Sequence, residues 1–124
     1  MAHPVFNKIG GEKGVERMVD YFYNKVLSDV ELAQFFYDVD TNRTKAKFKS
    51  YLTFALGGGE PFPENYLRDT HKHLVTDHGL CGHHFDLLVG KLESTMIGLG
   101  IDEESRGELL AIMEKTRGEI LNKS

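Results

Sequence analysis

Apolar residues recur three and four positions apart along most of the chain, which is the spacing that places them on one face of a helix. Glycines and prolines separate these segments, and the strict alternation typical of strands is absent from the sequence. The predicted helices cover roughly residues 12–27, a short turn at 32–36, 41–56, 66–77, 83–97 and 102–122. The pattern therefore predicts an all-α chain with five main helices and one short extra turn.

Polar residues and glycines indicate where several of these helices begin and end. Asp40 or Thr41 is expected to cap the helix over 41–56, and Asp102 the last helix, because their side-chain oxygens accept hydrogen bonds from the first free N–H groups. Residues 57–65 contain three consecutive glycines and two prolines. We expect a loop there, with the preceding helix ending at the glycines.

The composition is that of an ordinary globular domain. The 124 residues are 40% hydrophobic and 27% charged, and we expect one domain spanning residues 1–124. No apolar run approaches the roughly 20 residues that a transmembrane helix needs, and the first residues lack the pattern of a secretory signal. The net charge is −4 and the basic residues are scattered, so nucleic-acid binding is not expected. These observations favour a cytoplasmic protein without a membrane or nucleic-acid partner.

Histidine is concentrated in one part of the chain. Five of the six histidines fall within residues 71–84, which also contain the single cysteine, Cys81. A single cysteine excludes an internal disulfide and a cysteine-rich metal site. His71 lies four residues after Leu67 and three before Leu74, on the apolar face of its helix, whereas His73 is expected to face water.

Two interpretations of His71 remain open from this pattern. It is an ordinary core histidine that bonds a neighbouring carbonyl, or it is an axial ligand to haem iron. The sequence lacks Cys-x-x-Cys-His, so any haem would be held without a covalent thioether link. Apolar walls for a haem are available, although aromatic residues at helical spacing are equally typical of a core. The candidate wall residues are Tyr23, Phe35, Phe36, Phe48, Tyr51 and Leu52.

Several short motifs occur together and in order. They are Phe-x-Lys-x-Gly-Gly at 6–11, Phe22-Tyr23, Phe35-Phe36 with Asp38-Val39-Asp40, Phe54-Ala55-Leu56-Gly57-Gly58, Tyr66 five residues before His71, His78-Gly79-Leu80 and His84-Phe85-Asp86. With these motifs, from roughly Val5 to Leu121, the chain resembles the truncated haemoglobins of group I. The resemblance implies a truncated globin-like, two-over-two helical sandwich around a non-covalently bound haem b.

The resemblance also implies roles for individual residues. His71 would be the proximal iron ligand, Tyr23 the distal hydroxyl that donates a hydrogen bond to bound dioxygen, and Phe35 the phenylalanine that wedges against the haem. Leu67, Leu74 and Phe85 would line the proximal side, and Leu52 and Phe36 the distal side. Arg43, Arg68 and His78 would reach the haem propionates. The distal helix adds cofactor contacts at Thr44, Phe48 and Tyr51.

The chain departs from the family pattern at three places. Thr44 and Phe48 stand where many members have glutamine, so the distal hydrogen-bond network is expected to be thinner and very slow oxygen release is in doubt. Lys47 stands where some cyanobacterial members have an iron-binding histidine. It is either a surface residue whose ammonium reaches a propionate or water, or a distal iron ligand in the gas-free state. Residues 101–124 contain no histidine, so the covalent link to a haem vinyl group is not expected.

The resemblance implies a gas-binding function. Members bind dioxygen, nitric oxide and carbon monoxide, with oxygen transport, nitric oxide dioxygenation supported by a separate reductase, or redox and nitrogen-stress sensing as uses. We expect a monomer, and no enzyme with an organic substrate of its own, because no carboxylate pair or nucleophile–base arrangement is visible. The alternative is a haem-free helical metal-binding module that uses the histidines of 71–84 and Cys81.

Overall fold

Regular structure is entirely helical in residues 4–56 and 62–123, which are the parts of the chain that the computed structural model describes. In chain order the elements are α1 (Pro4–Ile9), α2 (Gly11–Leu27), α3 (Val30–Ala33), the 3₁₀ turn η1 (Gln34–Phe36), α4 (Thr41–Ala55), α5 (Tyr66–His78), α6 (Gly82–Gly98), α7 (Glu103–Glu114) and α8 (Arg117–Ile120). This confirms the all-α prediction. Within these residues, no helix has the length and apolar character needed to cross a membrane.

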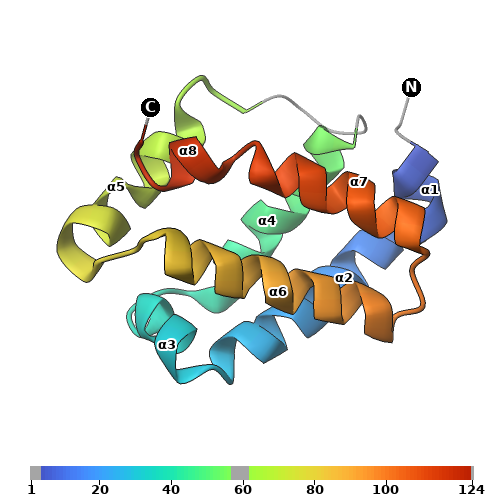
Figure 1. Ribbon diagram of the computed structural model, residues 1–124, viewed down its shortest axis with the longest axis horizontal. Coiled ribbons are helices and arrows are strands. Elements are labelled where there is room, and N and C mark those ends of the chain that lie inside the picture. Colours follow the sequence, from blue (N-terminus) through green and yellow to red (C-terminus); the bar gives the residue numbers. More distant parts are fainter. Residues whose placement is uncertain (1–3, 57–61, 124) are drawn as a thin grey trace.

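Two pairs of antiparallel helices form the body of the molecule (Figure 1). Helix α2 packs against α4, α6 packs against α7, and α2 also contacts α6, which joins the two pairs. Helices α5 and α8 lie side by side at the end of the molecule opposite α1. The arrangement is the predicted two-over-two sandwich, with α5 outside both pairs.

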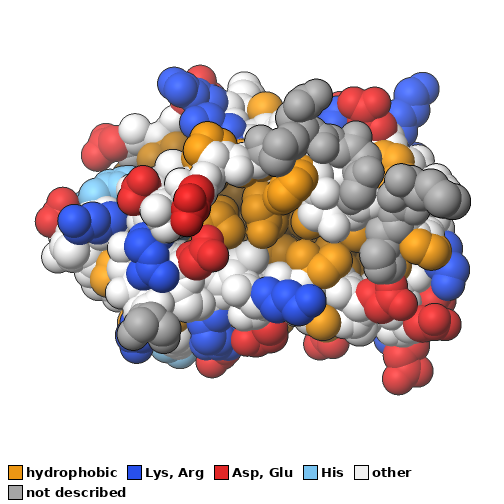
Figure 2. All heavy atoms as spheres, turned by 90° about the horizontal axis from the view of Figure 1, so that it is seen from above, with side chains coloured by type: hydrophobic (Ala, Val, Ile, Leu, Met, Phe, Trp, Pro, Cys, Tyr) orange, Lys and Arg blue, Asp and Glu red, His pale blue; other side chains and the backbone are white. Residues whose placement is uncertain are grey.

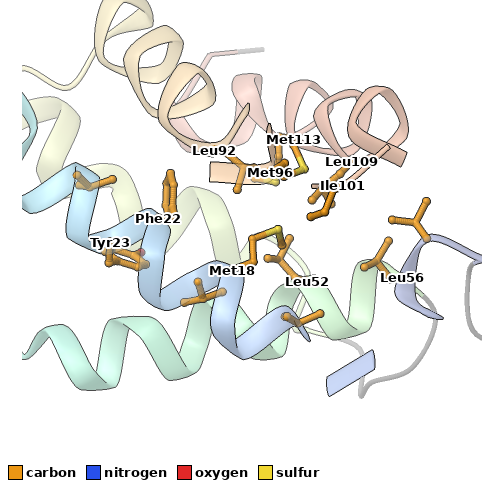
Figure 3. Packing of buried hydrophobic residues seen from close by; sticks show 14 of the residues in the cluster. Met18, Phe22, Tyr23, Leu52, Leu56, Leu92, Met96, Ile101, Leu109 and Met113 are labelled. Carbon is orange, nitrogen blue, oxygen red and sulfur yellow. The ribbon is translucent and has the colours of Figure 1, made fainter. Parts of the chain in front are cut away.

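The apolar faces of the two pairs meet in one main core. Figure 3 shows Met18 of α2, Leu52 of α4, Met96 of α6 and Leu109 of α7 converging there, and all four are fully buried. A second, smaller cluster joins the 3₁₀ turn to α6 and to the end of α8. Its buried members are Phe35, Leu80, Phe85 and Leu121. The main core stabilises the sandwich, and the second cluster lies beside α5.

The predicted starts of two helices are confirmed at atomic detail. The Asp40 carboxylate accepts hydrogen bonds from the backbone N–H groups of Asn42 and Arg43 at 3.1 and 3.3 Å, which caps α4. The Asp102 carboxylate accepts from the backbone N–H and the hydroxyl of Ser105 at 3.1 and 2.7 Å, which caps α7. Residues 62–65 are non-helical, as expected, and the rest of the predicted loop, 57–61, lies outside the described residues.

The last helix differs from the prediction, because the single helix expected over 102–122 is two helices. Helix α7 ends at Glu114 and α8 begins at Arg117. The buried hydroxyl of Thr116 donates to the Met113 carbonyl at 2.6 Å, and the Thr116 N–H donates to the same carbonyl at 3.0 Å. These bonds tighten the turn and compete with the α-helical pattern, which ends the first segment.

Helix α1 is a second difference, because no helix was predicted before residue 12. It has six residues, which is too short for a helical period to be recognised. Its carboxyl end lies directly against α2: a Cβ atom added to Gly14 would lie 2.0 Å from the carbonyl oxygen of Ile9. Only glycine permits this close approach of the two backbones.

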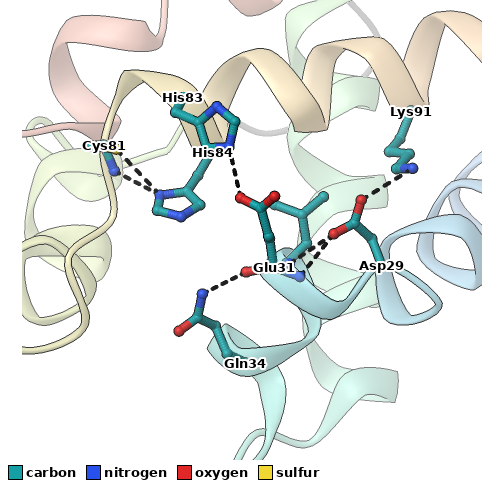
Figure 4. A network of polar contacts seen from close by, with 8 residues as sticks. Asp29, Glu31, Gln34, Cys81, His83, His84 and Lys91 are labelled. Atoms are coloured by element: carbon teal, nitrogen blue, oxygen red, sulfur yellow. Dashed lines mark hydrogen bonds and ion pairs between the residues drawn. The ribbon is translucent and has the colours of Figure 1, made fainter.

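Ion pairs add links between helices that already pack against each other. Lys45 of α4 lies 3.5 Å from Asp20 of α2, an exposed pair that contributes little to stability. The short α3 is connected to α6 by Asp29 with Lys91 at 3.3 Å and by Glu31 with His83 at 2.7 Å (Figure 4). These two contacts hold the segment that leads into Phe35 against α6.

Candidate functional site

His71 is held through one ring nitrogen and offers the other. Its Nδ1 lies 2.7 Å from the carbonyl oxygen of Leu67, one turn earlier in α5. A carbonyl only accepts hydrogen bonds, so Nδ1 carries the proton and Nε2 carries a lone pair. Burial lowers the pKa of His71. The hydrogen bond with the Leu67 carbonyl raises it by a smaller amount, and the nearby His73 lowers it further. The imidazole is therefore neutral at neutral pH, and its Nε2 makes no hydrogen bond to any described residue.

Helix α5 presents His71 without being buried itself. None of its residues is buried, and its partly buried side chains Leu74 and Val75 pack on the second cluster. It ends at Gly79, whose positive φ of 70° lets the next N–H turn back, so that the Leu80 N–H reaches the Leu74 carbonyl at 3.0 Å. This places Leu80 in the second cluster and fixes the carboxyl end of α5.

Tyr23 of α2 is a buried phenol with an unused hydroxyl. Only 7% of the residue is exposed, and its ring contacts Phe22, Phe36 and Phe48 with centroid distances of 5.2, 5.7 and 6.1 Å. Burial raises the pKa of Tyr23, so the phenol keeps its proton. Its Oη makes no hydrogen bond to a described residue, yet no fully enclosed side-chain oxygen among these residues lacks a partner. The Tyr23 hydroxyl must therefore reach open space.

The other candidate donor on the distal side is already engaged. The Thr44 hydroxyl donates to the backbone carbonyl of Asp40 at 3.2 Å. Phe48, one turn later in α4, packs on Phe22 at 5.4 Å and brings no polar group. Tyr23 is consequently the donor that stays free on this side.

Lys47 lies at the surface, on the edge of α4 that faces α5. Its ammonium is 5.9 Å from the ring centroid of Tyr66, the first residue of α5, which is the range of a cation–π contact. Tyr51 is half-buried nearby and contacts Phe62 at 5.5 Å. Burial, and then the charge of Glu119, raise the pKa of Tyr51. Lysine and aromatic rings thus connect α4 to the start of α5.

The three residues predicted to reach propionates are in different settings. Arg43 is exposed on α4, and His78 is exposed at the end of α5, with its ring 6.3 Å from that of His73. Arg68 is partly buried and donates to the backbone carbonyl of Lys123 at 3.3 Å. Their roles stay predictions, and part of the Arg68 guanidinium is already used within the chain.

The remaining predicted contacts divide between the two clusters. Phe35 and Phe85 are members of the second cluster, and Phe36 packs against both. Leu67 is partly buried on α5, whereas Leu52 is fully buried in the main core. The contact of Leu52 with a haem therefore stays a prediction, because its side chain has no exposed surface in the structure.

A hollow lined by hydrophobic side chains opens near the middle of the face seen from above, with charged side chains at its rim (Figure 2). A flat apolar macrocycle with two carboxylates requires this combination of apolar interior and charged edge. Separately, the structure provides a neutral imidazole with a free Nε2 at His71 and a buried phenol with a free hydroxyl at Tyr23. This donor set fits haem with one protein ligand and one hydrogen-bond donor.

Comparison with known families identifies the chain. Residues 4–122 match the bacterial-like globin family. The chain belongs to this family. It is 39% identical over 108 residues to the group 1 truncated hemoglobin GlbN of Synechocystis sp., with 87% of each chain covered.

Solved structures of related globins share the fold. The 2/2 hemoglobin from Synechococcus sp. PCC 7002, in the cyanomet state with covalently attached heme, has a TM-score of 0.91 and 32% identity, covering 96% of this chain and 98% of that one. The truncated hemoglobin from Tetrahymena pyriformis in its Fe(III) form has a TM-score of 0.83 and 28% identity, covering 94% and 97%. As a member of this family, the globin is a haem protein, and its activity is haem-based gas binding.

The haem-free alternative finds no support in the globin. Among the residues that the structure describes, no group of three or more histidine, cysteine, aspartate or glutamate side chains could hold a metal ion. Two of the clustered histidines have protein partners: His83 pairs with Glu31, and His84 Nδ1 accepts a hydrogen bond from the Cys81 backbone N–H at 3.2 Å and lies 3.5 Å from the Cys81 Sγ (Figure 4).

Sequence reasoning missed one residue that contacts a predicted site residue of this globin. The Arg117 guanidinium lies 4.5 Å from the ring centroid of Phe85 and pairs with Asp86 of α6 and Glu114 of α7. The hydrogen bonds that Arg117 donates to Glu114 and Asp86 raise its pKa further above its usual range. The spacing of three residues between Glu114 and Arg117 was the available signal, but the contact with Phe85 depends on tertiary structure.

Proposed function

We propose that this globin holds haem b non-covalently with His71 as the proximal iron ligand, and that it reversibly binds dioxygen, nitric oxide and carbon monoxide. The observation that carries the proposal is the Tyr23 hydroxyl, which is almost buried, protonated and without a partner among the described residues. Aromatic rings surround the phenol and its hydroxyl bonds no described residue, so a polar molecule beside it would gain a hydrogen bond worth about 1–2 kcal/mol. A polar gas ligand in the hollow supplies the acceptor.

The residues of the chain then have distinct tasks. Haem supplies a ferrous iron at which one diatomic gas molecule binds. His71 offers Nε2 while the Leu67 carbonyl fixes its ring and makes the nitrogen more basic. Tyr23 donates a hydrogen bond to the gas ligand, and the rings of Phe36 and Phe48 hold the phenol in place. Arg43, Arg68 and His78 are the proposed partners of the propionates.

Nitric oxide dioxygenation is the proposed reaction when both gases are present. Dioxygen, nitric oxide and one electron combine to nitrate, and the electron comes from a separate reductase. The apolar rings beside Tyr23 support the reaction because they exclude water from the ligand. Rapid mixing of the dioxygen-loaded globin with nitric oxide should yield one nitrate per haem, and turnover should continue only with added reductant.

Haem loading tests the proposed function directly. The purified globin should take up one haem and develop a strong Soret band. His71→Gly should lose the haem or hold it only when imidazole is added, because free imidazole can replace the missing ring. His73→Gly is the matched control on the same helix and should load haem normally. A His71→Gly protein with the wild-type spectrum would overturn the proximal assignment.

A further inference from the structure

The carboxyl end of the chain is interlocked with the first turns of α5. The Asn122 side-chain amide donates to the backbone carbonyl of Arg68 at 3.1 Å. In the opposite direction, the Arg68 guanidinium donates to the backbone carbonyl of Lys123 at 3.3 Å. Each residue thus supplies a side chain to the backbone of the other segment. Such a reciprocal pair fixes the relative position of two segments better than a single bond does.

These two hydrogen bonds lie next to the backbone carbonyl that orients His71. Arg68 directly follows Leu67, whose carbonyl accepts the hydrogen bond from His71 Nδ1. The Asn122 amide therefore holds the peptide group adjacent to the acceptor of the His71 ring. A displacement of this turn would move the Leu67 carbonyl and with it the preferred orientation of the imidazole.

Helix α5 has few other restraints of this kind. It contains no buried residue, and at its amino end Asn65 has a positive φ of 64° but makes no capping bond with its side chain. Within the described part of the chain, the side-chain hydrogen bonds that join its first turns to a distant segment are those with Asn122 and Lys123. The carbonyls of Pro63 and Asn65, which precede the helix, accept from N–H groups of its first turn.

The carboxyl end is itself firmly anchored. Asn122 has a φ of 56°, and the N–H groups of Asn122 and Lys123 donate to the carbonyls of Glu119 and Gly118 at 3.2 and 2.8 Å, which closes the end of α8. Leu121 is buried in the second cluster. The start of α8 is tied to α6 by the ion pair of Arg117 with Asp86. Asn122 thus connects α5 to a segment that is hydrogen-bonded, ion-paired and anchored by the buried Leu121.

We infer that Asn122 is a positioning residue for the proximal histidine: through the Arg68 backbone it fixes the turn of α5 that orients His71. The inference rests on the proposed function, because it concerns His71 as the haem ligand. The carboxyl end of α8 therefore tunes the strength of the bond from His71 to the cofactor, although it does not contact the ring.

Asn122→Gly is the variant that tests this role. Glycine keeps the positive φ and the closed end of α8, and removes only the amide donor. We expect a lower iron–histidine stretching frequency in the ferrous protein by resonance Raman, because a less well-held Nδ1 makes the ligand less basic. Haem dissociation should be about three- to tenfold faster, since outer partners of a ligand carry effects of this order. In the haem-free protein, hydrogen exchange of the α5 amides should be faster.

Two matched controls separate positioning from general stability. Asn65→Gly changes the residue with positive φ directly before α5, at the same end as Arg68, without removing a side-chain bond, and should leave the stretching frequency unchanged. Lys123→Ala keeps the carbonyl that accepts from Arg68 and should behave as wild type. If Asn122→Gly matched these controls in stretching frequency, haem loss and α5 exchange, the inference would be overturned.

The same experiment distinguishes failure of the inference from failure of the proposed function. A wild-type protein that forms no Soret band with haem would overturn the proposed function. A wild type that binds haem through His71, with Asn122→Gly identical to it, would overturn the positioning role alone. Exchange of the α5 amides in the haem-free protein decides whether Asn122 holds this helix even without the cofactor.

Discussion

Tyr23 has the free hydroxyl on the distal side, whereas the Thr44 hydroxyl donates to the Asp40 carbonyl. A buried hydrogen bond to a polar ligand is worth about 1–2 kcal/mol, and about 1.4 kcal/mol corresponds to a factor of ten. Tyr23→Phe should therefore speed dioxygen dissociation roughly tenfold in stopped-flow measurements. Thr44→Val is the control and should change the rate much less. Equal effects of the two variants would contradict the assignment.

Lys47 gives a second expectation about a single residue. Its ammonium lies over the Tyr66 ring, which supports the surface interpretation rather than coordination of iron. The ferric absorption spectra of wild type and Lys47→Ala should therefore agree from mildly acidic to mildly alkaline pH. A low-spin species that grows with pH in the wild type and is missing from the variant would instead show that Lys47 binds the iron, because only the deprotonated amine coordinates.

Individual residues differ in how far the sequence could define them. The apolar face of α5 indicated that His71 was special, and the structure adds the Leu67 hydrogen bond that one interpretation anticipated. The free hydroxyl of Tyr23 and the engaged hydroxyl of Thr44 could not be predicted, because rotamers depend on tertiary neighbours. Arg117 and Asn122 escaped notice for the same reason: their partners lie 31 and 54 residues away in the sequence.

The junction of α1 and α2 leads to a prediction at the scale of elements. Gly14→Ala would place a Cβ atom 2.0 Å from the Ile9 carbonyl oxygen, so the two helices must separate. We expect the free energy of unfolding to fall by about 2–3 kcal/mol in urea denaturation. Gly90→Ala in α6 is the control: its Cβ meets nothing within 4 Å, and we expect a gain of about 0.5–1 kcal/mol. Similar effects at both positions would contradict the close-approach argument.

The cap of α7 gives a pH dependence whose sign is fixed. The hydrogen bonds from the Ser105 hydroxyl and backbone lower the pKa of Asp102 below its ordinary value of 3.8 in the folded state. The charged carboxylate therefore stabilises the fold above pH 3.8, and this contribution is lost as the pH falls through the lowered pKa. In Asp102→Asn, the free energy of unfolding should fall less steeply than in wild type as the pH decreases through this range. In Glu103→Gln, it should fall as steeply as in wild type.

Helix positions followed from the sequence wherever a period and a cap coincided. Asp40 and Asp102 were identified as caps because their chemistry is local. Helix α1 and the break between α7 and α8 were not identified. The first has only six residues, and the second depends on the hydrogen bonds of one buried threonine. Short elements and interruptions are set by packing, which one sequence does not display.

The whole molecule combines a core with a separate cofactor site, and its stability should reflect both. Leu109→Ala should lower the free energy of unfolding by about 2–5 kcal/mol, because Leu109 is fully buried in the main core. Haem at a thousandfold its dissociation constant should add about 4 kcal/mol to wild type and variant alike. His71→Gly should lose that gain while unfolding like wild type without haem. Thermal melts followed by circular dichroism measure these effects. A stabilisation by haem that differed between wild type and Leu109→Ala would contradict the independence of core and cofactor site.

The architecture at this scale was the most predictable level. The helical spacing gave the fold class, and the ordered motifs gave the resemblance that the family match confirms. The contacts between distant segments, such as α5 with α8, could not be derived, since many arrangements bury the same apolar faces.

The absence of buried residues in α5 has a consequence for the lifetime of the protein. A helix whose residues are at most partly buried opens at a lower energetic cost than a helix of the core, and local opening is what a protease requires. On the proposed function, a bond from His71 to the haem iron would hold this segment closed. Proteolytic turnover of the globin should therefore follow its cofactor state, with cleavage in α5 removing molecules that have lost their haem before the rest of the fold is attacked.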